Sequence, residues 1–152
     1  MSLNVSPAMV DVAERGELGD AEFLTAVRES LPYAWQVVTT VVADLAAGSG
    51  TGAGGTGVDP TGIDGTSRDS GAEYAEYAVP PPDEAARGQL LRALASDAIR
   101  GSLERHFGVR LAFQNCHRLR AYRPAAVGGQ SHRRFTSVAA QVLNQTPQLR
   151  DC

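Results

Sequence analysis

The sequence lacks lysine altogether, and all 14 of its basic residues are arginine. GC-rich coding accounts for this bias, because Arg, Ala, Gly and Pro are all plentiful. Cysteine is scarce: Cys116 and Cys152 are too few for a disulfide framework, and we expect reduced thiols in a cytoplasm. No apolar run is long enough to span a bilayer, and residues 1–19 lack a signal-peptide pattern. These absences predict a cytoplasmic protein without a membrane partner.

Size and composition fit one domain covering residues 1–152, with 43% hydrophobic and 20% charged residues. The charge is unevenly distributed. Residues 1–86 carry 14 acids and three arginines, whereas residues 87–152 carry 11 arginines and three acids. Either the two halves neutralise one another, within the fold or in a homo-oligomer, or the basic half faces an acidic partner or a nucleic acid.

The N-terminal third of the chain reads as helical. Ser6 and Pro7 suit the start of a first helix, and Asp20 suits the N-cap of a second. Pro32 either kinks that second helix or begins a new one capped by Ser30. Residues 33–47 are apolar on most sides. A strand over residues 37–42 is an alternative there, but the length favours a buried central helix.

Glycine dominates residues 48–71, and almost nothing in this segment can be buried. Ordering it would therefore cost more entropy than burial returns. We predict a flexible Gly-rich insert over residues 48–79, of which residues 48–71 are dispensable for folding. Its G-x-G-x-x-G match at Gly50, Gly52 and Gly55 lacks the strand before and the helix after that a dinucleotide site needs.

A single long helix is predicted over residues 84–107, with Asp83 as N-cap and Gly108 as its stop. After Gly108, alternation of apolar and polar residues predicts half-buried strand structure from Val109 to Arg123. This segment forms either two strands or one long strand with a bulge. A loop over residues 125–134 and a final helix from Phe135 complete an α+β fold. It is mostly helical, with four to five helices and one or two antiparallel strands.

Three stretches resemble an uncharacterised family of small proteins from high-GC actinobacteria of the Streptomyces type. They are LPYAWQVV at 31–38, a long stretch that begins PPPDEAARGQLLRALASDAIRG at 80–101 and continues to residue 118, and FTSVAAQVLNQTPQLRDC at 135–152. The resemblance implies an actinobacterial cytoplasmic protein. It carries over no activity and no functional residue.

Two groups of side chains are candidates for a site. One is the polar cluster Asn115, Cys116 and His117, in which a thiol and an imidazole suggest nucleophile and base. In an extended strand, adjacent side chains point to opposite faces, so this pair is not expected to meet. The chain offers no metal-ligand spacing and no cofactor motif, so we predict neither a metal nor a cofactor.

The second group is arginine-rich and lies between residues 110 and 134. Arginines with an aromatic neighbour can engage phosphates and bases, although the sequence pI of about 5.6 is low for such a role. The candidate binding residues are Arg110, Arg118, Arg120, Tyr122, Arg123, Arg133 and Arg134.

We therefore predict a non-enzymatic interaction or regulatory module whose partner is a protein, either another copy or a different chain. Nucleic-acid binding through the arginine-rich 110–134 region is the first alternative. An enzyme that uses Cys116 or His117 is the second.

Overall fold

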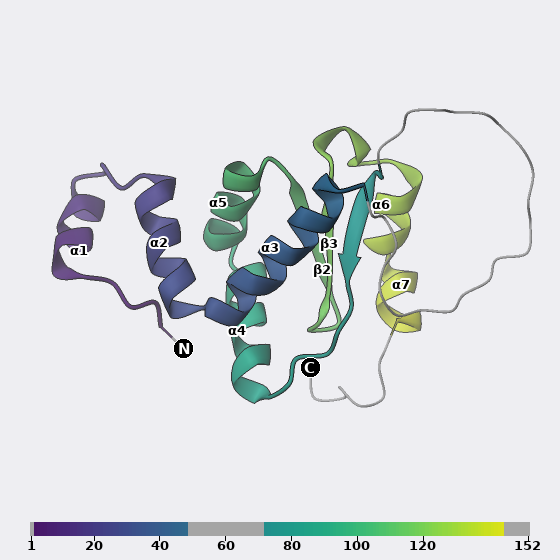
Figure 1. Cartoon of the computed structure of the whole chain (residues 1–152), viewed down its shortest axis with the longest axis horizontal. Helices are drawn as coiled ribbons and strands as arrows, with labels where there is room; N and C mark the ends of the chain where they lie inside the picture. Colours follow the sequence, from purple (N-terminus) through teal and green to yellow (C-terminus); the bar gives the residue numbers. More distant parts are fainter. Residues whose placement is uncertain (1, 49–71, 145–152) are drawn as a thin grey trace, which may run out of the picture.

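The computed structural model describes residues 2–48 and 72–144, and Figure 1 shows the arrangement of the elements. The N-terminal helices are α1 (Pro7–Glu14), α2 (Asp20–Ser30) and α3 (Pro32–Ala46). The remaining elements are β1 (Tyr74–Tyr77), α4 (Glu84–Ala95), α5 (Asp97–Phe107), β2 (Arg110–Gln114), β3 (Arg118–Tyr122), the 3-10 helix η1 (Pro124–Ala126), α6 (Gln130–Phe135) and α7 (Val138–Leu143).

The three strands form an antiparallel sheet in the order β1-β3-β2, with β3 in the centre. Ala121 of β3 is paired with Ala75 of β1 and with Leu111 of β2. Because side chains alternate along a strand, these three residues share one face of the sheet. They belong to the main hydrophobic core, which also includes buried residues of α2, α3, α4 and α5.

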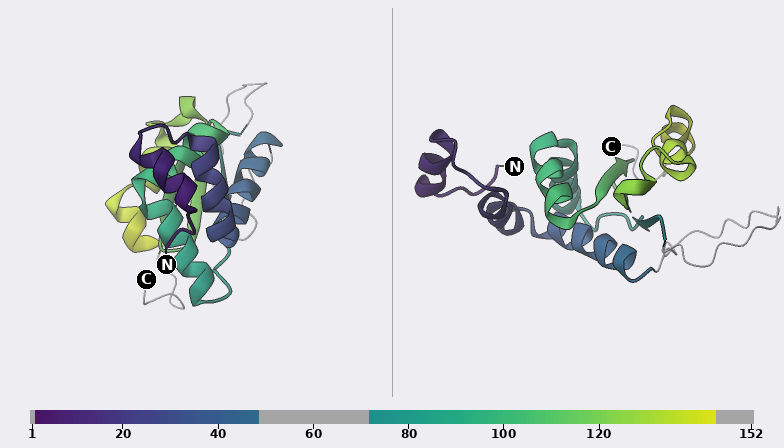
Figure 2. Two further views of the ribbon diagram at one scale, coloured as in Figure 1. Left: turned by 90° about the vertical axis from the view of Figure 1, so that its left-hand side faces the viewer. Right: turned by 90° about the horizontal axis from the view of Figure 1, so that it is seen from above.

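The opposite face of the sheet carries Tyr74, Tyr122 and Ala112, and Phe135 of α6 packs against it in a second, smaller cluster. The sheet therefore lies between a layer that contains α3, α4 and α5 and a thinner layer of α6 and α7 (Figures 1 and 2). Figure 1 and the right-hand view of Figure 2 place α1 at one end of the elongated molecule and α7 towards the other. The α+β class, the helical majority and the antiparallel strands are confirmed.

Local signals account for the starts of the N-terminal helices. Ser6 caps α1 through a hydrogen bond that its side chain accepts from the backbone N–H of Met9. Pro32 begins α3 as a separate helix, and residues 37–42 are helical. Ser30 is not its cap, because its hydroxyl instead accepts a hydrogen bond from the N–H of Asn4.

Asp20 lies inside α2, not at its N-cap, which is Gly19. Its carboxylate accepts two hydrogen bonds from Arg105, at 2.6 and 2.8 Å, and one from Ser102 at 2.9 Å. These bonds, first from Arg105 and then from Ser102, lower the pKa of Asp20 to about 2. The acidic N-terminal half and the basic C-terminal half therefore meet at this point within one chain.

The helix predicted over residues 84–107 is divided into α4 and α5 at Ser96. This residue has an extended backbone, with ψ near 116°, and its hydroxyl accepts a hydrogen bond from the N–H of Ile99. Ser96 followed by Asp97 is a helix-start signal that the continuous apolar stripe concealed. Gly108 ends α5 at a φ of 65°, as predicted, since this left-handed conformation suits glycine.

Two further elements differ from prediction. Residues 74–77, which the sequence assigned to the flexible insert, form the edge strand β1 because their backbone pairs with β3. Residues 130–135 form the short helix α6 where a loop was expected, and α7 follows as a separate helix. The described residues thus contain seven α-helices and three strands. Residues 49–71, the main part of the predicted insert, lie outside the described residues.

A turn at Asn115 and Cys116 separates β2 from β3, so the two-strand alternative is correct. Both residues have positive φ angles, 50° and 60°. A turn with positive φ at both central residues matches the twist of the two strands of a β-hairpin, and its usual sequence signal is Asn-Gly. Asn-Cys is a weaker signal, since only the first residue tolerates this conformation well.

Candidate functional site

A carboxylate of β1 holds together two of the predicted binding arginines of β3. Oε1 of Glu76 accepts hydrogen bonds from Arg118, one of them from Nε at 2.8 Å. Oε2 of the same carboxylate accepts from Nε of Arg120 at 2.7 Å. The three side chains are only 10–21% exposed. The pairing of β1 with β3 produces this group, which we call the Glu76 cluster.

Arg120 is enclosed further by aromatic rings. Its guanidinium carbon lies 4.4 Å from the ring centre of Tyr74 and 4.2 Å from that of Phe135. Both distances are within the range of cation–π attraction. Burial opposes its charge, but hydrogen bonds with Tyr122 and with Glu76 dominate and raise the pKa of Arg120 above its usual value. Arg120 is therefore held inside the molecule.

The other predicted strand residues are also engaged internally. Tyr122 is fully buried, and Arg110 forms an ion pair with Glu104 at 3.1 Å. Arg123 donates to the carbonyl oxygens of Ala72 and Leu45. These contacts are intramolecular, which is one of the two alternatives that the charge distribution left open.

Arg133 and Arg134 of α6 are the exception. Both are exposed, and neither forms an ion pair with any other residue that the structure describes. They directly precede Phe135, the one buried residue of α6. The structure therefore divides the predicted arginine group into an internally paired set on the strands and an exposed pair on α6.

The polar cluster of the β2–β3 turn does not present a nucleophile and a base. Cys116 is buried and disulfide-bonded, so the expectation of a reduced thiol is wrong for this residue. His117 is buried as well, with Nδ1 2.5 Å from the carbonyl oxygen of Asn115. Nδ2 of Asn115 donates to the carbonyl oxygen of Asn144 at 2.6 Å. An enzyme that uses Cys116 as its nucleophile would first need this disulfide reduced.

Sequence reasoning missed a surface on α7. Val138, Val142 and Leu143 are 84%, 66% and 80% exposed, and α7 has no buried residue. Single exposed apolar side chains are ordinary, but three of them on one six-residue helix are a local concentration of exposed apolar surface. Their helical spacing suggested a core face. Ser137 precedes them and caps α7 as a separate helix. This capping residue was the sequence signal against one continuous helix from Phe135.

Within residues 2–48 and 72–144, no helix is long and apolar enough to cross a membrane. The same residues bring together no group of three His, Cys, Asp or Glu side chains that could hold a metal ion.

Comparison with known proteins adds one match. A protein-family model described as "NucS shadow ORF" matches residues 1–152. This description names an open reading frame by its relation to NucS and states no activity, substrate or partner. No curated protein and no solved structure matched the chain.

Proposed function

The chain belongs to the NucS shadow ORF family, and we propose that it is a non-enzymatic interaction module that associates with further copies of itself. The observation that carries the proposal is the exposed apolar surface of α7. We call Val138, Val142 and Leu143 the α7 patch. The exposed cations Arg133 and Arg134 lie on the preceding helix. A partner surface for this patch should be apolar with an acidic border.

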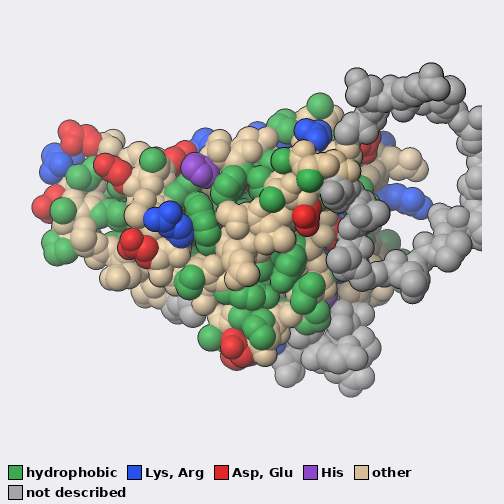
Figure 3. Space-filling view, viewed as in Figure 1, with side chains coloured by type: hydrophobic (Ala, Val, Ile, Leu, Met, Phe, Trp, Pro, Cys, Tyr) green, Lys and Arg blue, Asp and Glu red, His purple; other side chains and the backbone are tan. Residues whose placement is uncertain are grey.

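An apolar surface bordered by acidic residues lies at the opposite end of the folded molecule, on α1 and just before it. Val5 and Val10 are 44% and 42% exposed, and α1 has no buried residue. Asp11 and Glu14 are exposed beside Val10 and form no ion pair with any other described residue. We call Val5, Val10, Asp11 and Glu14 the α1 patch. Figure 3 shows acidic side chains gathered at the left end of the molecule, over α1 and α2.

Both patches are apolar, and the carboxylates Asp11 and Glu14 of the α1 patch are opposite in charge to Arg133 and Arg134 of α6, the helix that precedes the α7 patch. The two patches lie towards opposite ends of the long axis (Figures 1 and 2). A contact between the α7 patch of one copy and the α1 patch of the next is heterologous, so each added copy leaves one patch of each kind available. The association would then build open chains, or rings if the rotation between copies closes, and would not stop at a dimer.

We expect V142D to abolish or weaken this association about tenfold or more, because it removes buried apolar area and puts a carboxylate at the interface. Sedimentation velocity over a range of protein concentrations measures the self-association. As the concentration rises, the average mass of the unmodified chain should rise beyond that of a dimer. V79D is the matched control, because Val79 is 49% exposed and lies outside both patches. A chain that remains monomeric, or equal effects of both variants, would contradict the proposal.

Mixing two blocked variants tests the head-to-tail geometry. V142D blocks the α7 patch and V10D blocks the α1 patch, so each variant alone should be monomeric. The mixture should form a heterodimer and no larger species, because only one complementary pair of patches remains. Symmetric pairing of two α7 patches predicts instead that V10D self-associates, which would overturn the proposed geometry.

Nucleic-acid binding is the second candidate. The name of the matching family model, KH_NucS_shadow, contains KH, the name of a nucleic-acid-binding module with a GXXG backbone clamp. The α4–α5 connection here is Ser96 alone and carries no such clamp. Arg133 and Arg134 are the exposed arginines of the predicted region whose guanidinium groups make neither an ion pair nor a hydrogen bond within the described residues, whereas Arg123 donates to two carbonyl oxygens, so the pair on α6 is the candidate for phosphate contacts.

We expect the double variant R133E/R134E to abolish this binding if it occurs, because two phosphate contacts become repulsive. Fluorescence anisotropy with single-stranded RNA and DNA at low and high salt measures it. The unmodified chain should lose affinity steeply as salt rises, since neutralised phosphates release counterions. Absence of binding at micromolar protein and low salt would remove this candidate.

A further inference from the structure

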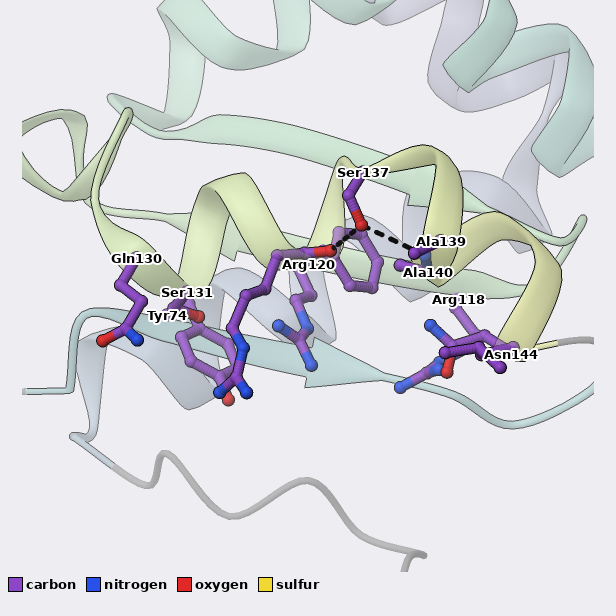
Figure 4. Close-up of a pocket in the computed structure, with 12 residues that line it drawn as sticks. Tyr74, Arg118, Arg120, Gln130, Ser131, Ser137, Ala139, Ala140 and Asn144 are labelled. Carbon is purple, nitrogen blue, oxygen red and sulfur yellow. Dashed lines mark hydrogen bonds between the residues drawn. The ribbon is translucent and has the colours of Figure 1, made fainter.

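An open cavity of about 630 Å³ lies between the sheet and the α6–α7 layer. Its lining includes Tyr74 of β1, Arg118 and Arg120 of β3, Ser131 and Arg134 of α6, and Asn144 after α7. Figure 4 shows Tyr74 and Ser131 near one end of the cavity, Arg118 and Asn144 near the other, and Arg120 between them. A volume of this size is in the range of small-molecule sites.

The charge around this cavity is unbalanced. Arg118, Arg120 and Arg134 contribute three guanidinium groups, and among the described residues Glu76 is the one carboxylate paired with them. No Asp or Glu is among the described residues that line the cavity. Counted over these groups of the described residues, the cavity has an excess of two positive charges.

Hydrogen-bond donors in the cavity also remain available. Arg118 uses Nε and Nη2 for Glu76, so Nη1 makes no hydrogen bond to the described residues. The Arg134 guanidinium makes no ion pair within the same part of the chain. Ser131 adds a hydroxyl, which can donate. The cavity thus presents donors and positive charge from two different elements.

We propose that this cavity binds a small phosphorylated molecule through its phosphate monoester. A phosphomonoester carries between about −1.5 and −2 charges at neutral pH, which matches the excess around the cavity. Guanidinium groups pair with phosphate through two parallel hydrogen bonds, which favours this anion. The remaining volume accommodates an organic group beside the phosphate. This proposal does not depend on the self-association proposed above.

Titration calorimetry with AMP and with adenosine tests the proposal on the full chain. AMP should bind, and adenosine, which lacks the phosphate, should not bind detectably. R134Q should weaken AMP binding about tenfold or more, because one charged hydrogen-bond donor is lost. Arg134 is exposed, so the variant should keep the fold, and circular dichroism would check this. R28Q is the matched control, since Arg28 is an exposed arginine on α2 outside the cavity lining.

The outcomes separate the possibilities clearly. AMP binding that R134Q weakens and R28Q leaves unchanged supports the site. Equal losses in both variants would mean general charge attraction and would overturn it. No AMP binding at about 1 mM ligand, corresponding to a free energy weaker than about −4 kcal/mol, would overturn it as well. Binding of an RNA oligomer without a terminal phosphate, in the absence of AMP binding, would assign the arginines to a phosphodiester backbone instead and would also overturn it.

Discussion

Glu76→Gln is expected to lower the free energy of unfolding by about 3 kcal/mol, because removing one member of a mostly buried ion pair leaves charge uncompensated. Arg118 and Arg120, at 21% and 15% exposure, would both lose their carboxylate partner. The substitution keeps the shape of the side chain, so the loss reports charge and hydrogen bonding more than packing. Urea denaturation at neutral pH measures the effect.

Glu17→Gln is the matched control for this substitution. Glu17 pairs with Arg15 at 3.0 Å, but the two side chains are 63% and 55% exposed. Solvent screens such a pair, so its loss should cost no more than about 0.5 kcal/mol. If both variants lower the free energy of unfolding by a similar amount, the Glu76 cluster stabilises the fold no more than an exposed ion pair does.

Phe135→Ala is expected to cost about 3–5 kcal/mol if unfolding remains cooperative, through lost burial and the cavity left behind. Phe135 is 3% exposed and is the one buried residue of α6. Its ring packs with Tyr122 and against the guanidinium of Arg120. Because α7 has no buried residue of its own, both helices depend on this anchor.

Hydrogen exchange distinguishes local from global effects of this variant. We expect the amides of α6 and α7 to lose protection together and to lose more of it than those of α3 and α5, because weakly packed segments also open separately from the core. Val138→Ala is the control: that side chain is 84% exposed, so its truncation should change stability by less than about 0.5 kcal/mol. Unchanged protection of α6 in Phe135→Ala would contradict the anchoring role.

Much of the helical layer was predictable because its signals are local. Ser6 and Pro7 begin α1, Pro32 begins α3, and Gly108 ends α5. Each of these acts through contacts within one helical turn, which the sequence displays directly. The Ser96 break was missed because the apolar stripe continues across it. In the structure the core residues Leu94 of α4 and Ile99 of α5 are five positions apart, which departs from the three-and-four spacing of a single helix.

The candidate site was predicted in part. The alternation of arginines along β3 indicated Arg118 and Arg120, but it did not indicate the carboxylate that pairs with them. Glu76 lies 42 and 44 residues away in sequence from the two arginines that it holds. No local pattern marks residues 74–77 as a strand, because this short segment becomes one only by pairing with β3. The exposed face of α7 likewise resembles a core face until its place above the sheet is known.

The sequence by itself determined some of the helix ends, the α+β class and the polarity of charge along the chain, since these depend on neighbouring residues and on composition. Only the tertiary structure decided which charges meet. Asp20 is paired with Arg105, Glu76 is paired with Arg118 and Arg120, and Arg133 and Arg134 have no ion pair among the described residues. The physical reason is that strand pairing and helix packing join distant segments, and the free energy of an ion pair depends on the burial that this packing creates.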